Sequence, residues 1–188
     1  MAEFFTINVA GLSRDLPVCK ISDDLYIGAF VIFGDVEMTV NCASELLKKA
    51  PPYDIMITAE SKGIPLIHEM ARQSGANTYI TARKSPKLYM KSPYAVDVTS
   101  ITTAKKQELY VDESDIAMMN GKKVLIVDDV ISTGESLKAI EKLVKVSGGE
   151  IAGKMAILAE GDAKYRDDII YLEYLPLLNK NGKAKDSK

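Results

Sequence analysis

The densest chemical pattern in the sequence runs from Val124 to Ser136 and has the sequence VLIVDDVISTGES. Its apolar start predicts a strand buried on both faces, and Asp128 and Asp129 follow where open α/β sheets bind ligands. A loop of hydroxyl and glycine residues then leads directly into a predicted helix. Such a loop turns backbone N–H groups toward the positive end of the helix dipole, which suits a phosphate. Carboxylates beside a phosphate-binding loop indicate a sugar phosphate, because they accept hydrogen bonds from sugar hydroxyls.

Two simpler explanations of this stretch have to be weighed. Residues 132–135 (STGE) also form a capping-box pattern, so the loop could merely begin a helix. The acidic strand could instead belong to a nucleotide hydrolase, which requires a G-x-x-x-x-G-K-[ST] loop elsewhere. Residues 148–154 have the pattern G-x-x-x-x-G-K, but Met155 follows, and the segment lies between a helix and a strand, the reverse of the required order. The joint pattern over 124–136 favours the sugar-phosphate site.

Two further segments could hold anions. Ser61-Lys62-Gly63 follows a predicted strand and precedes a predicted helix, so it repeats the strand–loop–helix arrangement, with an ordinary turn as the alternative. The second segment concentrates four positive charges within nine residues, for which a solvated surface is the alternative. A polyanionic ligand explains both segments together. The four basic residues are Arg83, Lys84, Lys87 and Lys91.

Composition limits the chemistry that is available. The chain has 188 residues and a net charge of −2, and 47% of its residues are hydrophobic, which suits one domain with a small appendage. This charge offers no general attraction to nucleic acid or to an anionic membrane, and the longest apolar run is far short of a membrane span. One histidine (His68) and two cysteines (Cys19, Cys42) make a zinc site or a Cys/His nucleophile pair improbable. We therefore expect a cytoplasmic protein that works through carboxylates, basic groups, hydroxyls and backbone amides.

Apolar runs alternate with helical stretches from residue 54 onward, which predicts β-α-β units on a parallel sheet. The intervening helices are expected at about 64–74, with Pro65 in the first turn, and at 135–147, ended by Gly148-Gly149. The predicted strands are 55–57, 78–80, 124–127, 155–158 and 169–172.

The remaining parts of the chain follow other patterns. Residues 1–50 are expected to form a smaller unit with strands at 4–9 and 25–33 and a helix that Asp35 caps. Between Ile80 and Val124 no helix is predicted, and a long, mobile β-hairpin is expected. The polar residues 179–188 are expected to be a frayed tail.

These motifs together resemble the type I phosphoribosyltransferases. Residues 124–136 resemble that family's motif for phosphoribosyl pyrophosphate (PRPP), and residues 57–63 (ITAESKG) resemble its pyrophosphate loop. Residues 82–88 (ARKSPKL) resemble the R-K-x-x-K-L segment of adenine phosphoribosyltransferases. The resemblance covers about residues 50–175. It implies an α/β fold: a Rossmann-like parallel sheet with helices on both faces, a base-binding hood (1–50), a core (51–178) and a long flexible loop (89–112).

The resemblance also implies a role for each site residue. Asp128 and Asp129 would hold the ribose hydroxyls and, with Arg83 and Lys87, form the catalytic group. The 5-phosphate would bind to Ser132, Thr133, Gly134, Glu135 and Ser136. The departing pyrophosphate would bind to Ser61, Lys62, Gly63, Arg83, Lys84 and Lys87. No set of metal-ligating side chains is predicted, and Mg²⁺ would enter with PRPP.

The implied activity is transfer of 5-phosphoribosyl from PRPP to a purine base, with adenine favoured and AMP and pyrophosphate as products. Ser132 replaces an aspartate of hypoxanthine-guanine enzymes, and residues 100–106 lack the glutamate of adenine enzymes and are closer to xanthine enzymes. Residues 159–161 (AEG) resemble a PRPP-binding purine repressor, and Glu160 is the candidate base-binding residue. A xanthine/guanine enzyme and a non-catalytic PRPP sensor that regulates transcription are the alternatives. Because the hood begins near residue 1 and the tail is short, we expect the enzyme, as a homodimer without nucleic-acid or membrane partners.

Overall fold

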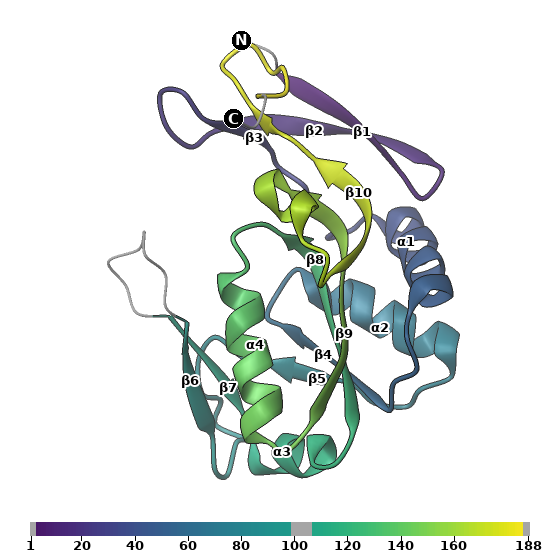
Figure 1. Cartoon of the computed structure of the whole chain (residues 1–188), viewed down its shortest axis with the longest axis vertical. Coiled ribbons are helices and arrows are strands. Elements are labelled where there is room, and N and C mark those ends of the chain that lie inside the picture. Colours follow the sequence, from purple (N-terminus) through teal and green to yellow (C-terminus); the bar gives the residue numbers. More distant parts are fainter. Residues whose placement is uncertain (1–2, 99–106, 186–188) are drawn as a thin grey trace.

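A five-stranded parallel sheet lies at the centre of the computed structural model, which describes residues 3–98 and 107–185 (Figure 1). Its strand order is β10-β9-β8-β4-β5. Because the strands are parallel, all of their carboxyl ends meet at one edge, where ligands bind in open α/β sheets. The strands are β4 (Ile55–Ala59), β5 (Ile80–Ala82), β8 (Lys123–Ile131), β9 (Glu150–Glu160) and β10 (Ile170–Leu175).

Both faces of this sheet are covered, as the sequence predicted. Helices α1 and α2 lie on one face, and α4 lies on the other beside the β6–β7 hairpin and the short helix α3 (Figure 1). The bounds are α1 (Val36–Lys49), α2 (Gly63–Ser74), β6 (Tyr94–Val98), β7 (Gln107–Val111), α3 (Glu113–Met119) and α4 (Glu135–Val146).

Strand β8 shows how the two faces divide the core. Val124 and Ile126 belong to the apolar cluster formed with α4, whereas Leu125 and Val127 belong to the cluster formed with α1 and α2. All four side chains are fully buried. The unbroken apolar run is therefore a consequence of burial on both sides of the sheet, which leaves the first polar side chains at the strand's carboxyl end.

A second, antiparallel sheet forms the hood, with strand order β1-β2-β3-β11. Strand β2 was not predicted from the sequence, and the predicted strand at 25–33 is reduced to β3, followed by a loop to α1. Helix α1 packs against α2, so residues 1–50 divide between the hood and the core layer. The hood strands are β1 (Phe4–Val9), β2 (Leu12–Lys20), β3 (Tyr26–Gly28) and β11 (Leu177–Leu178).

The C-terminal residues contradict the expected frayed tail as far as Lys185. The amide of Lys185 donates to the carbonyl of Leu177 at 2.7 Å, and that of Asn179 donates to Lys183 at 2.9 Å. This turn brings the segment back onto the hood through a bridge between Leu178 and Ala184. Backbone hydrogen bonds therefore order residues that composition alone marked as mobile.

The segment between Ile80 and Val124 contains the expected hairpin, β6 paired antiparallel with β7, but also helix α3, which was not predicted. Asp112 and Asp115 form a capping box at the start of α3, a signal that the sequence carries. Residues 99–106, including the whole 100–106 stretch compared above with other enzymes, lie outside the described residues, and the flexibility of this loop stays a prediction. The strand predicted at 78–80 lies two residues later, at β5 (Ile80–Ala82).

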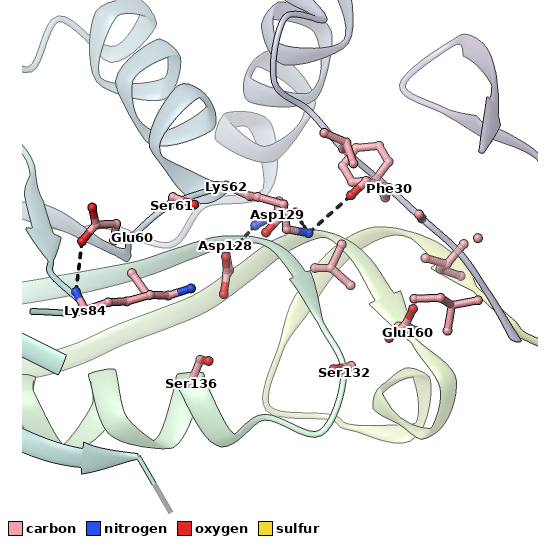
Figure 2. A pocket seen from close by; sticks show the side chains of 17 residues that line it. Phe30, Glu60, Ser61, Lys62, Lys84, Asp128, Asp129, Ser132, Ser136 and Glu160 are labelled. Carbon is pink, nitrogen blue, oxygen red and sulfur yellow. Dashed lines mark hydrogen bonds and ion pairs between the residues drawn. The ribbon is translucent and has the colours of Figure 1, made fainter. Parts of the chain in front are cut away.

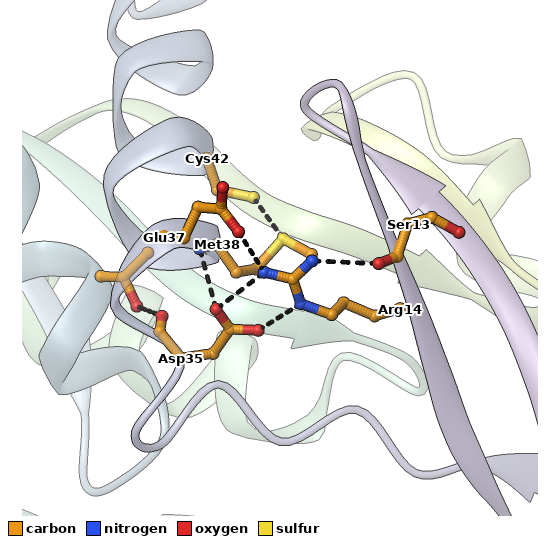
Figure 3. Close-up of polar contacts among 7 residues, drawn as sticks. Ser13, Arg14, Asp35, Glu37, Met38 and Cys42 are labelled. Carbon is orange, nitrogen blue, oxygen red and sulfur yellow. Dashed lines mark hydrogen bonds and ion pairs between the residues drawn. The ribbon is translucent and has the colours of Figure 1, made fainter.

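The hood is tied to the core by Asp35, which has two roles (Figure 3). Its Oδ1 accepts a hydrogen bond from the Met38 amide at 3.0 Å, which caps α1 as predicted. Its carboxylate also pairs with Arg14 of β2, at 2.7 Å from Nε and 3.1 Å from Nη2. The Arg14 guanidinium, which also contacts Glu37, lowers the pKa of Asp35. Because the pKa is lowered, this carboxylate stabilises the fold above its ordinary pKa, and the contribution is lost as the pH falls.

We expect Asp35→Ala to lower the free energy of unfolding by about 1–2 kcal/mol, because α1 loses its N-cap. Urea denaturation at neutral pH measures this loss. The control is Glu37→Gln, which changes an exposed partner of the same arginine and should cost about 0.5 kcal/mol. Equal losses in the two variants would contradict the assigned role of Asp35.

Candidate functional site

A cavity of about 440 Å³ lies between the carboxyl edge of the parallel sheet and the hood (Figure 2). The loops after β4 and β8, the end of β9 and the hood segment 27–31 form its walls. The cavity therefore collects side chains that are far apart in the sequence. Those predicted as site residues are Ser61, Lys62, Lys84, Asp128, Asp129, Ser132, Ser136 and Glu160.

The two aspartates lie on the floor of this cavity. Asp129 is only 4% exposed, and its buried Oδ2 lies 2.7 Å from the Lys62 ammonium. Oδ2 therefore has an ion-pair partner but no hydrogen-bond donor among the described residues. Burial, and then the charge of Asp129, raise the pKa of Asp128. The pair thus concentrates negative charge and unused acceptor capacity at one point.

Gly63 makes this arrangement possible. A Cβ atom at this position would lie 2.2 Å from Thr58 Oγ1 and 3.3 Å from Asp128 Oδ1. Any other residue would push the start of α2 away from the aspartates. The absence of a side chain at Gly63 therefore lets the start of α2 pack closely against β4 and Asp128.

Lys62 points across the cavity toward the hood (Figure 2). Besides Asp129, its ammonium contacts the carbonyl oxygen of Phe30 at 3.3 Å. From the sequence, Lys62 was expected to bind pyrophosphate together with Ser61 and Lys84. In this structure its charge instead neutralises Asp129 and connects the core to the hood.

The basic segment is organised by Glu60, which was not among the predicted site residues. Its Oε2 accepts a hydrogen bond from the Lys84 amide at 3.0 Å and lies 3.4 Å from Arg83 Nε and 3.7 Å from Lys87 Nζ. The Lys84 amide, and then the charge of Arg83, lower the pKa of Glu60. Arg83 Nε is buried without a hydrogen-bond partner among the described residues. The signal was available, because Glu60 directly precedes Ser61 within the motif already singled out.

The loop after β8 encloses a hollow of about 80 Å³, lined by Asp128 and residues 130–137. Gly134 has φ +79° and is the N-cap of α4, so Ser132 is not the capping residue that the simpler explanation required. Because Gly134 has no side chain, the first amides of α4 have no side-chain cap, and the residues that carry them line the hollow. The loop has the size and the donors of an anion site.

Glu160 ends β9 and lies at the boundary of two cavities. It lines the first cavity and a second one of about 530 Å³, which has apolar walls from Ile21, Leu25 and Ile27 of the hood. Desolvation raises the pKa of Glu160, and Lys62 opposes this shift. The hood residues that line the two cavities are mainly apolar and could not be identified as site residues from the sequence. They contribute the shape of the walls and backbone groups.

Neither a protein-only metal site nor a membrane-spanning helix is present in the described part of the chain. Residues 3–98 and 107–185 contain no group of three or more His, Cys, Asp or Glu side chains that could hold a metal ion. Among the same residues, no helix has the length and apolar character needed to cross a membrane.

The sequence of this chain matches a protein-domain family and also individual known proteins. Residues 43–183 match the phosphoribosyl transferase domain family. A hypoxanthine/guanine phosphoribosyltransferase of Methanocaldococcus sp. (strain FS406-22) is 32% identical over 111 residues, 59% of this chain and 53% of that protein. An adenine phosphoribosyltransferase of Thermotoga sp. (strain RQ2) is 35% identical over 108 residues, 57% of this chain and 59% of that protein. The chain spans about half the length of the curated relatives it matches.

Solved structures share the fold at lower identity. The adenine phosphoribosyltransferase of Thermoanaerobacter pseudethanolicus superposes with a TM-score of 0.64 at 22% identity, over 76% of this chain and 84% of that one. The enzyme of Giardia lamblia, complexed with 9-deazaadenine, gives 0.64 at 18% identity over 91% and 93%. With the family match covering three quarters of the sequence, the chain belongs to the phosphoribosyl transferase domain family.

Proposed function

We propose that this protein transfers 5-phosphoribosyl from PRPP to a purine base, releasing pyrophosphate. The observation that carries this proposal is the position of Asp128 and Asp129, between an anion-sized loop and a second anion-binding segment. Ribose on the aspartates would place its 5-phosphate in the 132–136 loop and its pyrophosphate near Ser61 and Lys84. The base would then lie toward the hood and Glu160.

The residues support such a transfer through charge. The bond between ribose C1 and pyrophosphate breaks while the bond to the base nitrogen forms, so positive character develops at C1. Buried Asp129 lies where it can stabilise that charge through the ribose hydroxyls. The ammonium groups of Lys84 and Lys87 and the guanidinium of Arg83 would hold the departing pyrophosphate, and Arg83 and Lys87 would exchange Glu60 for phosphate oxygens. The hood would restrict water around C1.

The donor set fits a magnesium ion that arrives with the substrate. Two carboxylates, one of them with an oxygen lacking a hydrogen-bond donor, match a site that also needs phosphate oxygens and water. When bound there, Mg²⁺ would supply charge neutralisation for the pyrophosphate. Asp128 and Asp129 are the residues that would hold it.

Adenine is the base we propose. An ionised carboxylate at Glu160 accepts hydrogen bonds and donates none, so it suits the 6-amino group and disfavours a carbonyl oxygen. Relatives with both adenine and hypoxanthine/guanine names match this chain at similar identity, so Glu160 and the 82–88 segment are what favour adenine. We further propose a cytoplasmic homodimer, for which the exposed apolar side chains of Val31, Phe33 and Val36 offer a surface.

The decisive experiment measures pyrophosphate release from Mg-PRPP with a panel of adenine, hypoxanthine, guanine, xanthine and pyrimidine bases. We expect adenine to give the highest kcat/KM. Tight PRPP binding without turnover on any base would instead support the sensor, and a preferred 6-oxopurine would support the alternative enzyme.

We expect Asp129→Asn to lower kcat/KM in this assay by about 100-fold, because the ribose loses a charged acceptor at the reacting centre. Circular dichroism should show an unchanged fold. Asp15→Asn, an exposed change on β2, is the matched control and should leave the rate at wild type. Full activity in both Asp128→Asn and Asp129→Asn would overturn the assignment of the ribose site.

The raised pKa of Asp128 predicts a pH dependence of ligand binding. A raised pKa keeps the carboxyl protonated to higher pH, so the form that accepts from ribose hydroxyls grows as the pH rises. Ribose 5-phosphate should therefore bind more tightly at about pH 9 than at pH 7, a range in which a phosphate monoester with a pKa of about 6 is already dianionic. Titration calorimetry measures the trend, and Asp128→Asn should flatten it. An unchanged slope in that variant would contradict the role of Asp128.

Glu160→Gln tests how the base is read. We expect the KM for adenine to rise about tenfold, since a charged hydrogen bond is lost, while the KM for PRPP stays within about twofold. A glutamine can donate to a carbonyl, so hypoxanthine should gain relative to adenine. Asp162→Asn, at an exposed neighbour, is the control. If neither KM nor the ratio of bases changes, Glu160 is a structural residue.

A further inference from the structure

Arg166 follows the short 3₁₀ helix η1 (Gly161–Tyr165), outside every motif of the sequence analysis. Its guanidinium is held in a bidentate contact with Asp168, from Nε to Oδ1 at 2.9 Å and from Nη2 to Oδ2 at 2.8 Å. Asp168 is itself held by Lys154 of β9, which also contacts Glu141 of α4 at 3.0 Å. The orientation of the guanidinium is therefore determined by a network of four charged residues.

The third guanidinium nitrogen, Nη1, lies against the loop after β8. A Cβ atom on Gly134 would be only 2.5 Å from Nη1, so the guanidinium packs against the N-cap residue of α4. Arg166 also lines the second cavity, of about 530 Å³, together with Ser132 and Thr133 of that loop. Its charge thus lies beside the loop, on the side of the second cavity and next to the hollow of about 80 Å³ that residues 130–137 line.

The charged side chains of the loop itself are all acidic, so a cation outside the loop affects how it binds an anion. Residues 128–136 contain three carboxylates, Asp128, Asp129 and Glu135, and no lysine or arginine. A phosphate monoester brings a further charge of about −1.5 to −2 at neutral pH. Backbone amides and the helix dipole supply only partial positive charge, equivalent to roughly half a unit. Lys62 pairs with Asp129 and Lys138 with Glu135, so these two cations balance carboxylates of the segment and leave the charge of the ligand itself to be met by a further cation.

We propose that Arg166 is a further phosphate-binding residue of this protein, which places its guanidinium charge at the loop for the 5-phosphate. This inference rests on the proposed function for the identity of the ligand. Asp168 orients the guanidinium but also offsets its charge. The two residues therefore have opposite effects on an anion in the loop, which gives the inference a specific signature.

The experiment measures binding of ribose 5-phosphate and of inorganic pyrophosphate to the full chain by titration calorimetry. Arg166→Gln should weaken ribose 5-phosphate about tenfold and leave pyrophosphate within about twofold, because a charged hydrogen-bonding partner is lost at one phosphate only. Arg166→Lys should recover part of the loss. Asp168→Asn, which keeps the arginine and removes its counter-charge, should bind ribose 5-phosphate at least as tightly as wild type.

Arg72→Gln is the matched control, since Arg72 makes the same bidentate contact with Glu69 on α2, away from the loop. It should change neither affinity. Ribose 5-phosphate affinity within twofold of wild type in Arg166→Gln would overturn the inference. Equal weakening in Arg166→Gln and Asp168→Asn would also overturn it, because the pair would then only brace the loop. Pyrophosphate release by wild type tests the proposed function separately, so the two can fail independently.

Discussion

Two adjacent carboxylates at the end of a buried strand are the constraint on which the rest of the site depends. Charge in a poorly solvated place is costly unless it is paired, and Asp128 and Asp129 also repel each other. Three features accompany this pair: Lys62 forms an ion pair with Asp129, Gly63 allows the start of α2 to approach closely, and the pKa of Asp128 is raised. Lys62 thereby places the loop after β4 and the hood segment at Phe30, and Gly63 places the start of α2, relative to the end of β8.

The cations of the site follow a common pattern. Lys62 is paired with Asp129, Arg83 and Lys87 with Glu60, and Arg166 with Asp168. A protein that binds a polyanion must hold several positive charges close together without ligand, and carboxylate partners reduce their mutual repulsion. In the proposed function, an incoming phosphate would compete with these carboxylates. Affinity would then be a difference between two sets of ion pairs, sensitive to substitutions of the acidic partners as well.

Much of the fold and part of the site could be predicted because their signals are local. The N-cap of α1 at Asp35, the end of α4 before Gly148, the apolar run of β8 and the phosphate-loop pattern each depend on neighbours in the chain. Strand β2 was missed because residues 12–20 alternate exposed side chains such as Asp15 with an inner row that includes the charged Arg14, which pairs with Asp35. The ordered segment 179–185 was missed because its stability comes from backbone hydrogen bonds to the hood, which composition does not encode.

The sequence by itself determined the kind of chemistry: a strand that ends in paired carboxylates, a glycine-containing loop before a helix, and a basic segment. Chemical type and short-range spacing suffice for those features. Only the tertiary structure decided that Glu60 organises the basic segment, that Lys62 turns toward the hood, and that Arg166 rests on Gly134. These are contacts between side chains and segments up to 32 residues apart, from Phe30 to Lys62 and from Gly134 to Arg166. They arise because parallel strands bring their carboxyl ends to one edge, where charges from separate loops must neutralise one another.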